Sequence, residues 1–303
     1  MTGPRWFVTG AGGQLATEFA GLLEGEVFLS HEEALDIRDA GAVRAAVRGF
    51  EPDVVLHTAA YTDVDGAEAD PAGAESVNVG GTRNVVAALR GTHTALVYFS
   101  TDYVFDGEKR APYLESDAPG PLGVYGRTKL EGERLVLEWP HGIVIRTSWL
   151  FSATGRNFVK TILAAATERA GGERPPGERP GEGAPAGDAA RTGEPLRVVD
   201  DQVGSPTFAG HLAAAVDEAL RLGVGPGIYH MAGSGYCSWF ELAREIVALA
   251  GLDVDVLPIT TAELGRPAPR PAFSALASER PVPRLPHWVD GVAAALEQLT
   301  PQR

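Results

Sequence analysis

Short apolar runs alternate with amphipathic stretches through the first half of the chain. The runs are rich in Val, Ile, Leu and Phe, which is typical of buried strands, and they cover residues 5–8, 27–29, 54–57, 95–99 and 143–146. Between them, apolar residues recur at the spacing of one helix face over residues 13–23, 40–48, 78–90 and 125–137. This alternation predicts a parallel sheet with right-handed crossovers, the doubly wound α/β arrangement.

The alternation becomes less regular after residue 150. A helical pattern over 157–166 leads into residues 168–195, where Gly, Pro, Ala and charged residues dominate. That composition offers too little apolar surface to offset the entropy of ordering, so we expect a mobile surface loop. Ser238 and Glu241 fit a capping box at the start of a later helix. Strands are also predicted over 196–199 and 228–231, and helices over 209–222 and 289–299.

Composition and charge narrow the class of protein. Hydrophobic residues at 44% and charged residues at 22% are ordinary for a soluble globular chain of 303 residues. The net charge of −14 disfavours nucleic acid or an anionic membrane surface as a partner, because both would repel it. A single cysteine, Cys237, excludes an intrachain disulfide and a cysteine-based zinc site. No apolar run approaches the ~20 residues of a membrane span, and the first strand leaves no room for a signal peptide, so a cytoplasmic location is expected.

The first strand ends in a glycine-rich turn, "TGAGGQLA", residues 9 to 16. Gly10, Gly13 and Ala16 form G-x-x-G-x-x-A at a strand-to-helix junction. Glycine permits a tight turn and the close approach of a pyrophosphate, and the helix amides would face the phosphates. The turn therefore predicts a dinucleotide site at the first βα junction.

The end of the second strand leaves the choice between NADH and NADPH open. A residue about 20 positions after the first glycine usually contacts the adenosine ribose, and Ser30 followed by His31 stands there. No carboxylate is present to repel a 2′-phosphate, and no arginine to bind one. Asp36 and Ile37 could line the adenine pocket, although Asp36 could equally cap the next helix.

Three polar residues downstream form a pattern with a mechanism. Thr101 ends the fourth strand, where ligands bind in parallel sheets. Tyr125 follows 24 positions later, and Lys129 lies one helical turn beyond it. Y-x-x-x-K by itself is common by chance, but a dinucleotide turn and a strand-end hydroxyl accompany it here.

This combination resembles the extended short-chain dehydrogenase/reductase family and, more closely, the dTDP-4-dehydrorhamnose reductase family. The closer resemblance lies in stretches that follow the family's order over nearly the whole chain. They are "GQLATE" (13–18), "AAYTDVDGAE" (59–68), "STDYVFDG" (100–107), "VYGRTKLEGE" (124–133), "RTSWLF" (146–151), "DDQVGSPT" (200–207) and "RPAFSAL" (270–276).

The resemblance implies a role for each matching residue. Tyr125 would protonate the C4 oxygen of a dTDP-4-keto-6-deoxysugar as the nicotinamide delivers hydride to C4. Lys129 would favour the phenolate and bond the nicotinamide ribose, and Thr101 would bond the substrate carbonyl. Asp102 and Trp149 match positions that contact the deoxysugar or its nucleotide. Positions that contact NADPH or NADH are matched by Gly10, Gly13, Gln14, Leu15, Ser30, Asp36, Ile37, Ala60, Tyr61, Thr62, Tyr125 and Lys129.

The resemblance also implies a division into two lobes. Residues 1–150, with 208–232 returning to them, would form an NAD(P)-binding Rossmann domain. Residues 151–207 and 233–303 would form a smaller substrate-binding α/β lobe that includes the loop 168–195. Some relatives bind magnesium through a glutamate at the position of Glu18, but an exposed helical carboxylate is expected here and no metal is predicted. A monomer or a homodimer is expected.

Departures from the family pattern keep other functions open. Gly66 stands where a lysine is common and Phe273 where an asparagine is common, so a related keto sugar, such as the precursor of dTDP-dihydrostreptose, is an alternative. A second alternative is a non-catalytic relative such as the regulatory β subunit of methionine adenosyltransferase, although the complete set of Thr101, Tyr125 and Lys129 argues against it. A third is a nucleotide-sugar epimerase or dehydratase, because Asp102 adds an acid beside Thr101.

Overall fold

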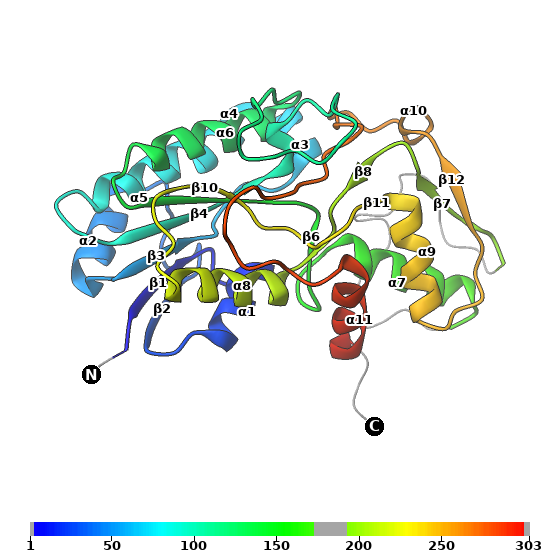
Figure 1. The fold of residues 1–303 in the computed structure, drawn as a ribbon, viewed down its shortest axis with the longest axis horizontal. Helices are drawn as coiled ribbons and strands as arrows, with labels where there is room; N and C mark the ends of the chain where they lie inside the picture. The colour runs from blue at the N-terminus through cyan, green and yellow to red at the C-terminus, as the bar shows by residue number, and fades with distance from the viewer. Residues whose placement is uncertain (1–2, 173–192, 300–303) are drawn as a thin grey trace.

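A computed structural model describes residues 3–172 and 193–299 of the protein (Figure 1). Within them, six parallel strands form the main sheet in the order β2-β1-β3-β4-β5-β10. The strands are β1 (Arg5–Thr9), β2 (Glu26–Ser30), β3 (Val54–His57), β4 (Ala95–Thr101), β5 (Gly142–Thr147) and β10 (Gly227–His230). The doubly wound sheet predicted from the apolar runs is confirmed, and the chain changes direction across the sheet between β1 and β3.

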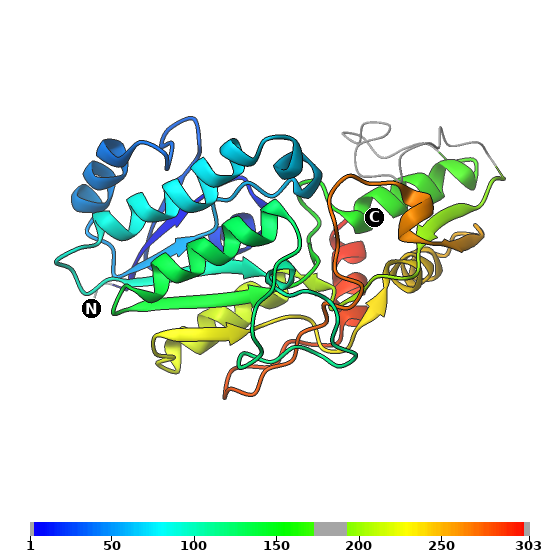
Figure 2. The same cartoon turned by 90° about the horizontal axis from the view of Figure 1, so that it is seen from above.

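Helices cover both faces of the sheet because successive strand residues point to opposite sides. Trp6 and Val8 pack on the side of α1 (Gln14–Leu22) and α8 (Ala209–Arg221). Phe7, between them, packs on the other side with α2 (Ala40–Phe50), α5 (Thr82–Ala88) and α6 (Val124–Leu137). Figure 2 shows α5 and α6 lying over the sheet from that side. The buried strands thus have two apolar faces, as their continuous apolar runs imply.

The boundaries of several helices differ from the sequence prediction. The stretch expected as one helix over 78–90 is a π-helical turn, η1 (Ser76–Gly81), followed by α5. Two short helices, α3 (Val64–Ala69) and α4 (Pro71–Glu75), were not predicted. The alternative role of Asp36 as a helix cap is wrong, because Asp39 caps α2 by accepting hydrogen bonds from the amides of Gly41 and Ala42. Across the described residues, no helix combines the length and apolar character needed to cross a membrane.

A second lobe stands beside the sheet and has its own apolar core. Its helices are α7 (Phe158–Arg169), α9 (Trp239–Leu249) and α11 (Trp288–Leu299), and they pack with the parallel pair β7 (Leu196–Val199) and β12 (Val256–Ile259). The capping box of Ser238 and Glu241 at the start of α9 is confirmed. The remaining short elements are η2 (Asp102–Val104), β6 (Leu150–Phe151), β8 (Val203–Gly204), β9 (Thr207–Phe208), β11 (Cys237–Ser238) and α10 (Thr261–Leu264).

The loop expected at 168–195 begins later than predicted. Helix α7 continues to Arg169, whose side chain is buried, so the first two residues of the expected loop are helical. Residues 173–192 lie outside the described residues. Further along the chain, α8 packs on α1, and β10 extends the main sheet beside β5.

After α10 the chain returns from the second lobe to the main lobe, which Figures 1 and 2 show in orange and red. We call residues 265–279 the crossing segment. Arg270 in this segment reaches Asp65 on α3, and Ser274 reaches Asp102 at the end of β4. The crossing segment therefore ties the second lobe to the carboxyl edge of the main sheet.

Candidate active site

The glycine turn lies at the point where the sheet changes direction. Gly10 has a φ of +72°, and a Cβ atom there would lie 2.7 Å from the backbone of Ala59 after β3. Only glycine fits both the left-handed conformation and this close approach. The side chain of Thr58 donates to the carbonyl of Thr9, so the ends of β1 and β3 are held together. Ligands of doubly wound folds bind in the crevice at such a switch point.

Helix α1 begins at this turn with its amides uncapped by any side chain of the described residues. The free N–H groups and the helix dipole favour an anion such as a pyrophosphate. Leu15 is buried in the core, so it can offer a ligand only its backbone. The Gln14 side chain accepts hydrogen bonds from Asn157 at 2.9 Å and from Ser152 at 3.3 Å, which ties the turn to the start of α7.

Three hydroxyl groups along the carboxyl edge of the sheet are buried without a hydrogen-bond partner among the described residues. Ser30 ends β2, Thr147 ends β5, and Ser100 precedes the last residue of β4. Buried polar groups are nearly always satisfied, and an unsatisfied one costs about 1–3 kcal/mol. A polar ligand along this edge would satisfy them, so these residues fit the dinucleotide that the glycine turn predicts.

The residues expected around the adenosine differ in their surroundings. Ser30 is buried, and its carbonyl accepts a hydrogen bond from the amide of Ala11 in the glycine turn at 2.9 Å. Asp36 is half-buried and bonds Arg38, and these hydrogen bonds hold the pKa of the Asp36 carboxyl below its usual range. Ile37 packs against Gly81, where a Cβ atom would lie 2.4 Å from its side chain.

The loop after β3 carries Ala60, Tyr61 and Thr62, and a buried asparagine holds it in place. Asn78 accepts from the amide of Tyr61 at 2.8 Å and donates to its carbonyl at 3.2 Å. The same side-chain amide donates to Thr128 on α6 at 3.0 Å. Asn78 thus connects the expected cofactor loop to the helix of Tyr125 and Lys129. The sequence prediction missed Asn78, which stood at the start of a predicted helix with no motif of its own.

Thr101 and Tyr125 lie side by side. Thr101 ends β4, is 7% exposed, accepts from the amide of Tyr103 and donates to Asp102 at 3.0 Å. Tyr125 lies in the first turn of α6 and packs edge-to-face on Tyr103, with ring centroids 6.0 Å apart. Burial and the nearby Asp102 carboxylate raise the pKa of Tyr125 to about 12, although a hydrogen bond with Thr101 opposes the shift. Tyr125 is therefore protonated at neutral pH, as a proton donor must be.

Lys129 is buried one turn further along α6. Burial lowers the pKa of its ammonium to about 7, while the nearby Glu133 carboxylate raises it. The ammonium nitrogen lies over the ring of Tyr98, 4.1 Å from the ring centroid. From the sequence, Lys129 is expected to favour the phenolate form of Tyr125. In the structure, burial is the largest influence on the pKa of Tyr125, and it favours the protonated form.

A buried ion pair stabilises the helix that carries Tyr125 and Lys129. Glu133 on α6 and Arg146 on β5 are almost inaccessible to solvent, and two hydrogen bonds of 2.9 and 2.7 Å join them. Arg146 also lies over the ring of Phe105 and near His230 on β10. The sequence contained one signal for this pair, an arginine within an otherwise apolar strand.

The Asp102 carboxylate is hydrogen-bonded to neighbouring hydroxyl groups. It accepts hydrogen bonds from Thr101 and from Ser274 of the crossing segment. Burial raises its pKa to about 6, and the neighbouring hydroxyl groups of Ser274, Thr101 and Ser148 oppose that shift. The carboxyl group therefore connects the end of β4 to the crossing segment.

A second set of contacts fixes the crossing segment above the site. Asp65 on α3 accepts from Arg270 at 2.9 and 3.1 Å, from Arg266 at 3.0 Å and from the amide of Ala268 at 3.1 Å. Burial alone would raise the pKa of Asp65, but the two guanidinium groups hold it below its usual range. The Arg270 guanidinium also donates to the carbonyl of Ala268 at 3.0 Å.

Arg266 and Arg270 line a pocket of about 140 Å³ in the second lobe. Trp239 and Phe158 form its aromatic wall, with ring centroids 4.5 Å apart. Trp149 stacks on Trp239 at 3.4 Å, and its indole also lies against Gly204. The other lining residues are Arg197, Val198, Val199, Gln202 and Leu264.

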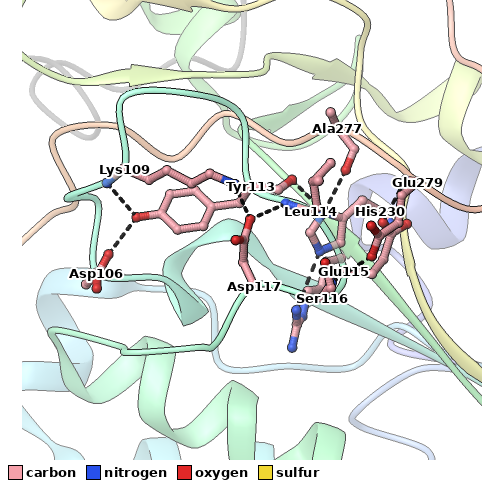
Figure 3. Close-up of polar contacts among 11 residues, drawn as sticks. Asp106, Lys109, Tyr113, Leu114, Glu115, Ser116, Asp117, His230, Ala277 and Glu279 are labelled. Atoms are coloured by element: carbon pink, nitrogen blue, oxygen red, sulfur yellow. Dashed lines mark hydrogen bonds and ion pairs between the residues drawn. The ribbon is translucent and has the colours of Figure 1, made fainter.

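The chain between η2 and α6 is held by carboxylate groups, which Figure 3 shows. Asp117 accepts from the amide of Leu114 at 2.7 Å and pairs with Lys109. Glu115 accepts from the backbone amides of His230 and Glu279, at 2.9 and 3.0 Å. This network joins the loop that precedes Tyr125 to β10 and to the end of the crossing segment.

The positions that depart from the family pattern have local explanations. A Cβ atom at Gly66 would lie 2.5 Å from the Asp63 carboxylate that caps α3, so a side chain at this position would displace that carboxylate. Phe273 packs edge-to-face on Tyr236 at 5.5 Å. Glu18, expected to be exposed, is half-buried beside Gly210 of α8, and this burial raises its pKa. Within the described residues, no group of three or more metal-binding side chains gathers.

Comparison with known proteins shows similarity to one family over nearly the whole chain. The family model described as the RmlD substrate binding domain matches residues 5–171 and 187–300. A dTDP-4-dehydrorhamnose reductase of Streptomyces griseus is 40% identical over 91% of this chain and 86% of its own length. A probable dTDP-4,6-dihydroxy-2-methyloxan-3-one 4-ketoreductase of Streptomyces antibioticus is 39% identical over 91% of this chain and 88% of its own. The crystal structure of a Bacillus anthracis dTDP-4-dehydrorhamnose reductase in complex with NADP is 33% identical, with a TM-score of 0.87 over 98% of this chain and 100% of that one.

Proposed function

The chain belongs to the dTDP-4-dehydrorhamnose reductase family, and we propose that it is an NAD(P)H-dependent oxidoreductase that reduces the C4 keto group of a dTDP-4-keto-6-deoxysugar. The principal substrate is dTDP-4-dehydro-L-rhamnose, which gives dTDP-L-rhamnose. The observation that carries the proposal is the pairing of Thr101 with Tyr125 at the carboxyl edge of the sheet, with Lys129 one turn along the same helix.

Each residue of this group has a distinct task in the proposed reaction. NAD(P)H, when bound, supplies the hydride. Tyr125 donates its phenolic proton to the oxygen at C4, and Thr101 orients that oxygen by a hydrogen bond. Lys129 bonds the nicotinamide ribose and stabilises the negative charge left on Tyr125.

The glycine turn and the strand ends would hold the cofactor. The uncapped amides of α1 receive the pyrophosphate, and Gly10 and Gly13 allow it to approach the backbone. Ser30 would contact the adenosine ribose, because its buried hydroxyl has no hydrogen-bond partner among the described residues. With neither a carboxylate nor an arginine at this position, both NADPH and NADH are accepted.

The pocket beside the crossing segment supports an activated sugar as the substrate. Arg266 and Arg270, which share the Asp65 carboxylate, bring two guanidinium groups to the lining of this pocket. Guanidinium groups match the geometry of phosphate oxygens, and Trp239 offers an aromatic face to a base or a sugar. We therefore place the dTDP part of the substrate here, with its sugar directed past Trp149 towards Tyr125.

The contacts of Asp102 weigh against a dehydratase. An acid that protonates a leaving hydroxyl group must be able to reach the substrate, whereas Asp102 is buried and hydrogen-bonded to Thr101 and Ser274. A purely regulatory relative would have no use for a proton donor beside a strand-end hydroxyl.

A cofactor-oxidation assay tests this proposal. Purified protein is mixed with NADPH and, separately, with dTDP-4-dehydro-L-rhamnose and other dTDP-4-keto-6-deoxysugars, while absorbance of the reduced nicotinamide is followed. Tyr125→Phe is the matched control, since it removes one oxygen atom and keeps the ring. We expect oxidation with the parent and a loss of ~10²–10⁴ in kcat with the variant. Cofactor binding without oxidation by any sugar would favour a regulatory protein instead.

A further inference from the structure

We propose that Tyr98 is a positioning residue for Lys129, and that its buried ring holds the lysine ammonium in the place and protonation state that the cofactor requires. The proposal rests on the proposed function in one respect, the assignment of Lys129 to the nicotinamide ribose. Tyr98 itself has no direct part in that assignment, because it lies beneath Lys129 on β4 and is 1% exposed.

Contacts at both ends fix the Tyr98 side chain. The ammonium nitrogen of Lys129 lies 4.1 Å from the ring centroid, within the range of a cation–π interaction. At the other end, the Tyr98 hydroxyl donates to the carbonyl of Lys129 at 3.4 Å. A Cβ atom at Gly132 would lie 2.3 Å from this hydroxyl, so glycine on the next turn of α6 makes room for it. The ring can hardly move without displacing α6.

The other charged and titratable groups around Lys129 leave the ring a distinct role. Glu133 on the same helix attracts the ammonium, but it is also bonded twice to Arg146 on β5. His57 on β3 is neutral at physiological pH, because burial first and the Lys129 charge second lower its pKa to about 3. On the neighbouring α3 and η2, Glu68 accepts from the amide of Val124 and Asp102 acts on Tyr125. The Glu133 carboxylate therefore divides its attraction between Lys129 and Arg146, whereas the face of the Tyr98 ring attracts the Lys129 ammonium alone.

Lys129 also keeps its hydrogen-bonding capacity for a ligand. In the part of the chain that the structure describes, its ammonium makes no hydrogen bond or ion pair with another side chain. A π face stabilises a cation without accepting its N–H groups in hydrogen bonds to oxygen. The ammonium can thus remain charged in a desolvated place and still offer its protons to ribose hydroxyls. A carboxylate in the position of Tyr98 would occupy those protons.

A double-mutant cycle on cofactor affinity tests this proposal. NADPH is titrated at pH 7 against the parent, Tyr98→Leu, Lys129→Met and the double variant, with nicotinamide fluorescence as the readout and unfolding midpoints measured alongside. A buried cation–π contact is worth about 2 kcal/mol, so Tyr98→Leu should weaken binding by roughly 10- to 30-fold. Tyr98→Phe keeps the face and should stay within about threefold of the parent.

The outcome in the Lys129→Met background decides between positioning and packing. If Tyr98 acts through the ammonium, Tyr98→Leu should have little further effect once the charge is gone. An equal loss of affinity in both backgrounds, or parent-like affinity in Tyr98→Leu, would overturn the proposal. The titrations contain no sugar, so a protein that binds NADPH but reduces no keto sugar would refute the proposed function while leaving this cycle informative.

Discussion

Raising the pH from 7 to 9 should weaken NADPH binding to the free protein, and Lys129 should be the cause. Burial lowers the pKa of its ammonium to about 7. Only the protonated form can donate three hydrogen bonds and carry the charge that complements the cofactor. About half of the molecules hold that form at pH 7 and about 1% at pH 9, so the apparent Kd should rise by up to ~50-fold, which corresponds to ~2.3 kcal/mol.

The neighbouring groups titrate outside this window. Asp102 has a pKa of about 6 and Tyr125 of about 12. A phosphomonoester such as the 2′-phosphate of NADPH has its second pKa near 6, so this group is mostly in its doubly ionised form from pH 7 to 9. The assay is a fluorescence titration of NADPH at half-unit steps from pH 6 to 9, repeated with Lys129→Met. A parent Kd that stays constant to pH 9, or the same rise in Lys129→Met, would refute the reasoning.

The same titration acts on folding with the opposite sign. The folded pKa of Lys129 lies below its unfolded value of about 10.4, so the unfolded chain binds more protons between about pH 7 and 10. Lys129 therefore adds to the free energy of unfolding as the pH rises through this window. Cofactor affinity falls over the same range, so a general loss of structure could not account for both trends.

Four substitutions extend these expectations. Tyr125→Phe should lower kcat by ~10²–10⁴ while the Kd for NADPH, measured by fluorescence, stays near that of the parent. Glu133→Gln should lower the free energy of unfolding by ~3–5 kcal/mol in urea titrations, because it leaves Arg146 charged and unpaired in the core. Ser30→Asp should shift the ratio of kcat/KM towards NADH by repelling the 2′-phosphate, and an unchanged ratio would show that Ser30 does not contact the ribose. Trp149→Ala should cost ~3 kcal/mol of stability, because the ring stacks on Trp239, and should also raise the KM for the sugar.

The strands and the catalytic residues could be predicted because their signals are local. A run such as "VVLH" at 54–57 has one physical explanation in a doubly wound fold, and it forms β3 with those bounds. A strand end and a helical spacing predict Thr101, Tyr125 and Lys129, and the structure brings Thr101 close enough to Tyr125 to oppose the rise in the pKa of Tyr125. The alternative role of Asp36 as a helix cap is wrong because Asp39, three residues later, offers its carboxylate to the amides of α2.

The remaining features depend on contacts between residues far apart in the sequence. Asp65 and Arg270 are separated by 205 residues, and nothing in either stretch reveals that one carboxylate is shared by two guanidinium groups. The contact of Lys129 with the Tyr98 ring could not be predicted either. Strand periodicity places Tyr98 on one face of the sheet, but it does not show which helical residue will pack over it. Such pairs can be assigned only when the three-dimensional packing of the elements is known.

The central claim, reduction at C4 with Tyr125 as the proton donor, is tested most directly by following the hydride itself. The protein is supplied with NADPH that carries deuterium at the transferable position and with dTDP-4-dehydro-L-rhamnose, and the sugar product is examined by NMR. The account predicts deuterium at C4 of a dTDP-deoxysugar from the parent protein and hardly any in the same time from Tyr125→Phe. Deuterium at another carbon, deuterium that never leaves the cofactor, or equal transfer by the variant would contradict it.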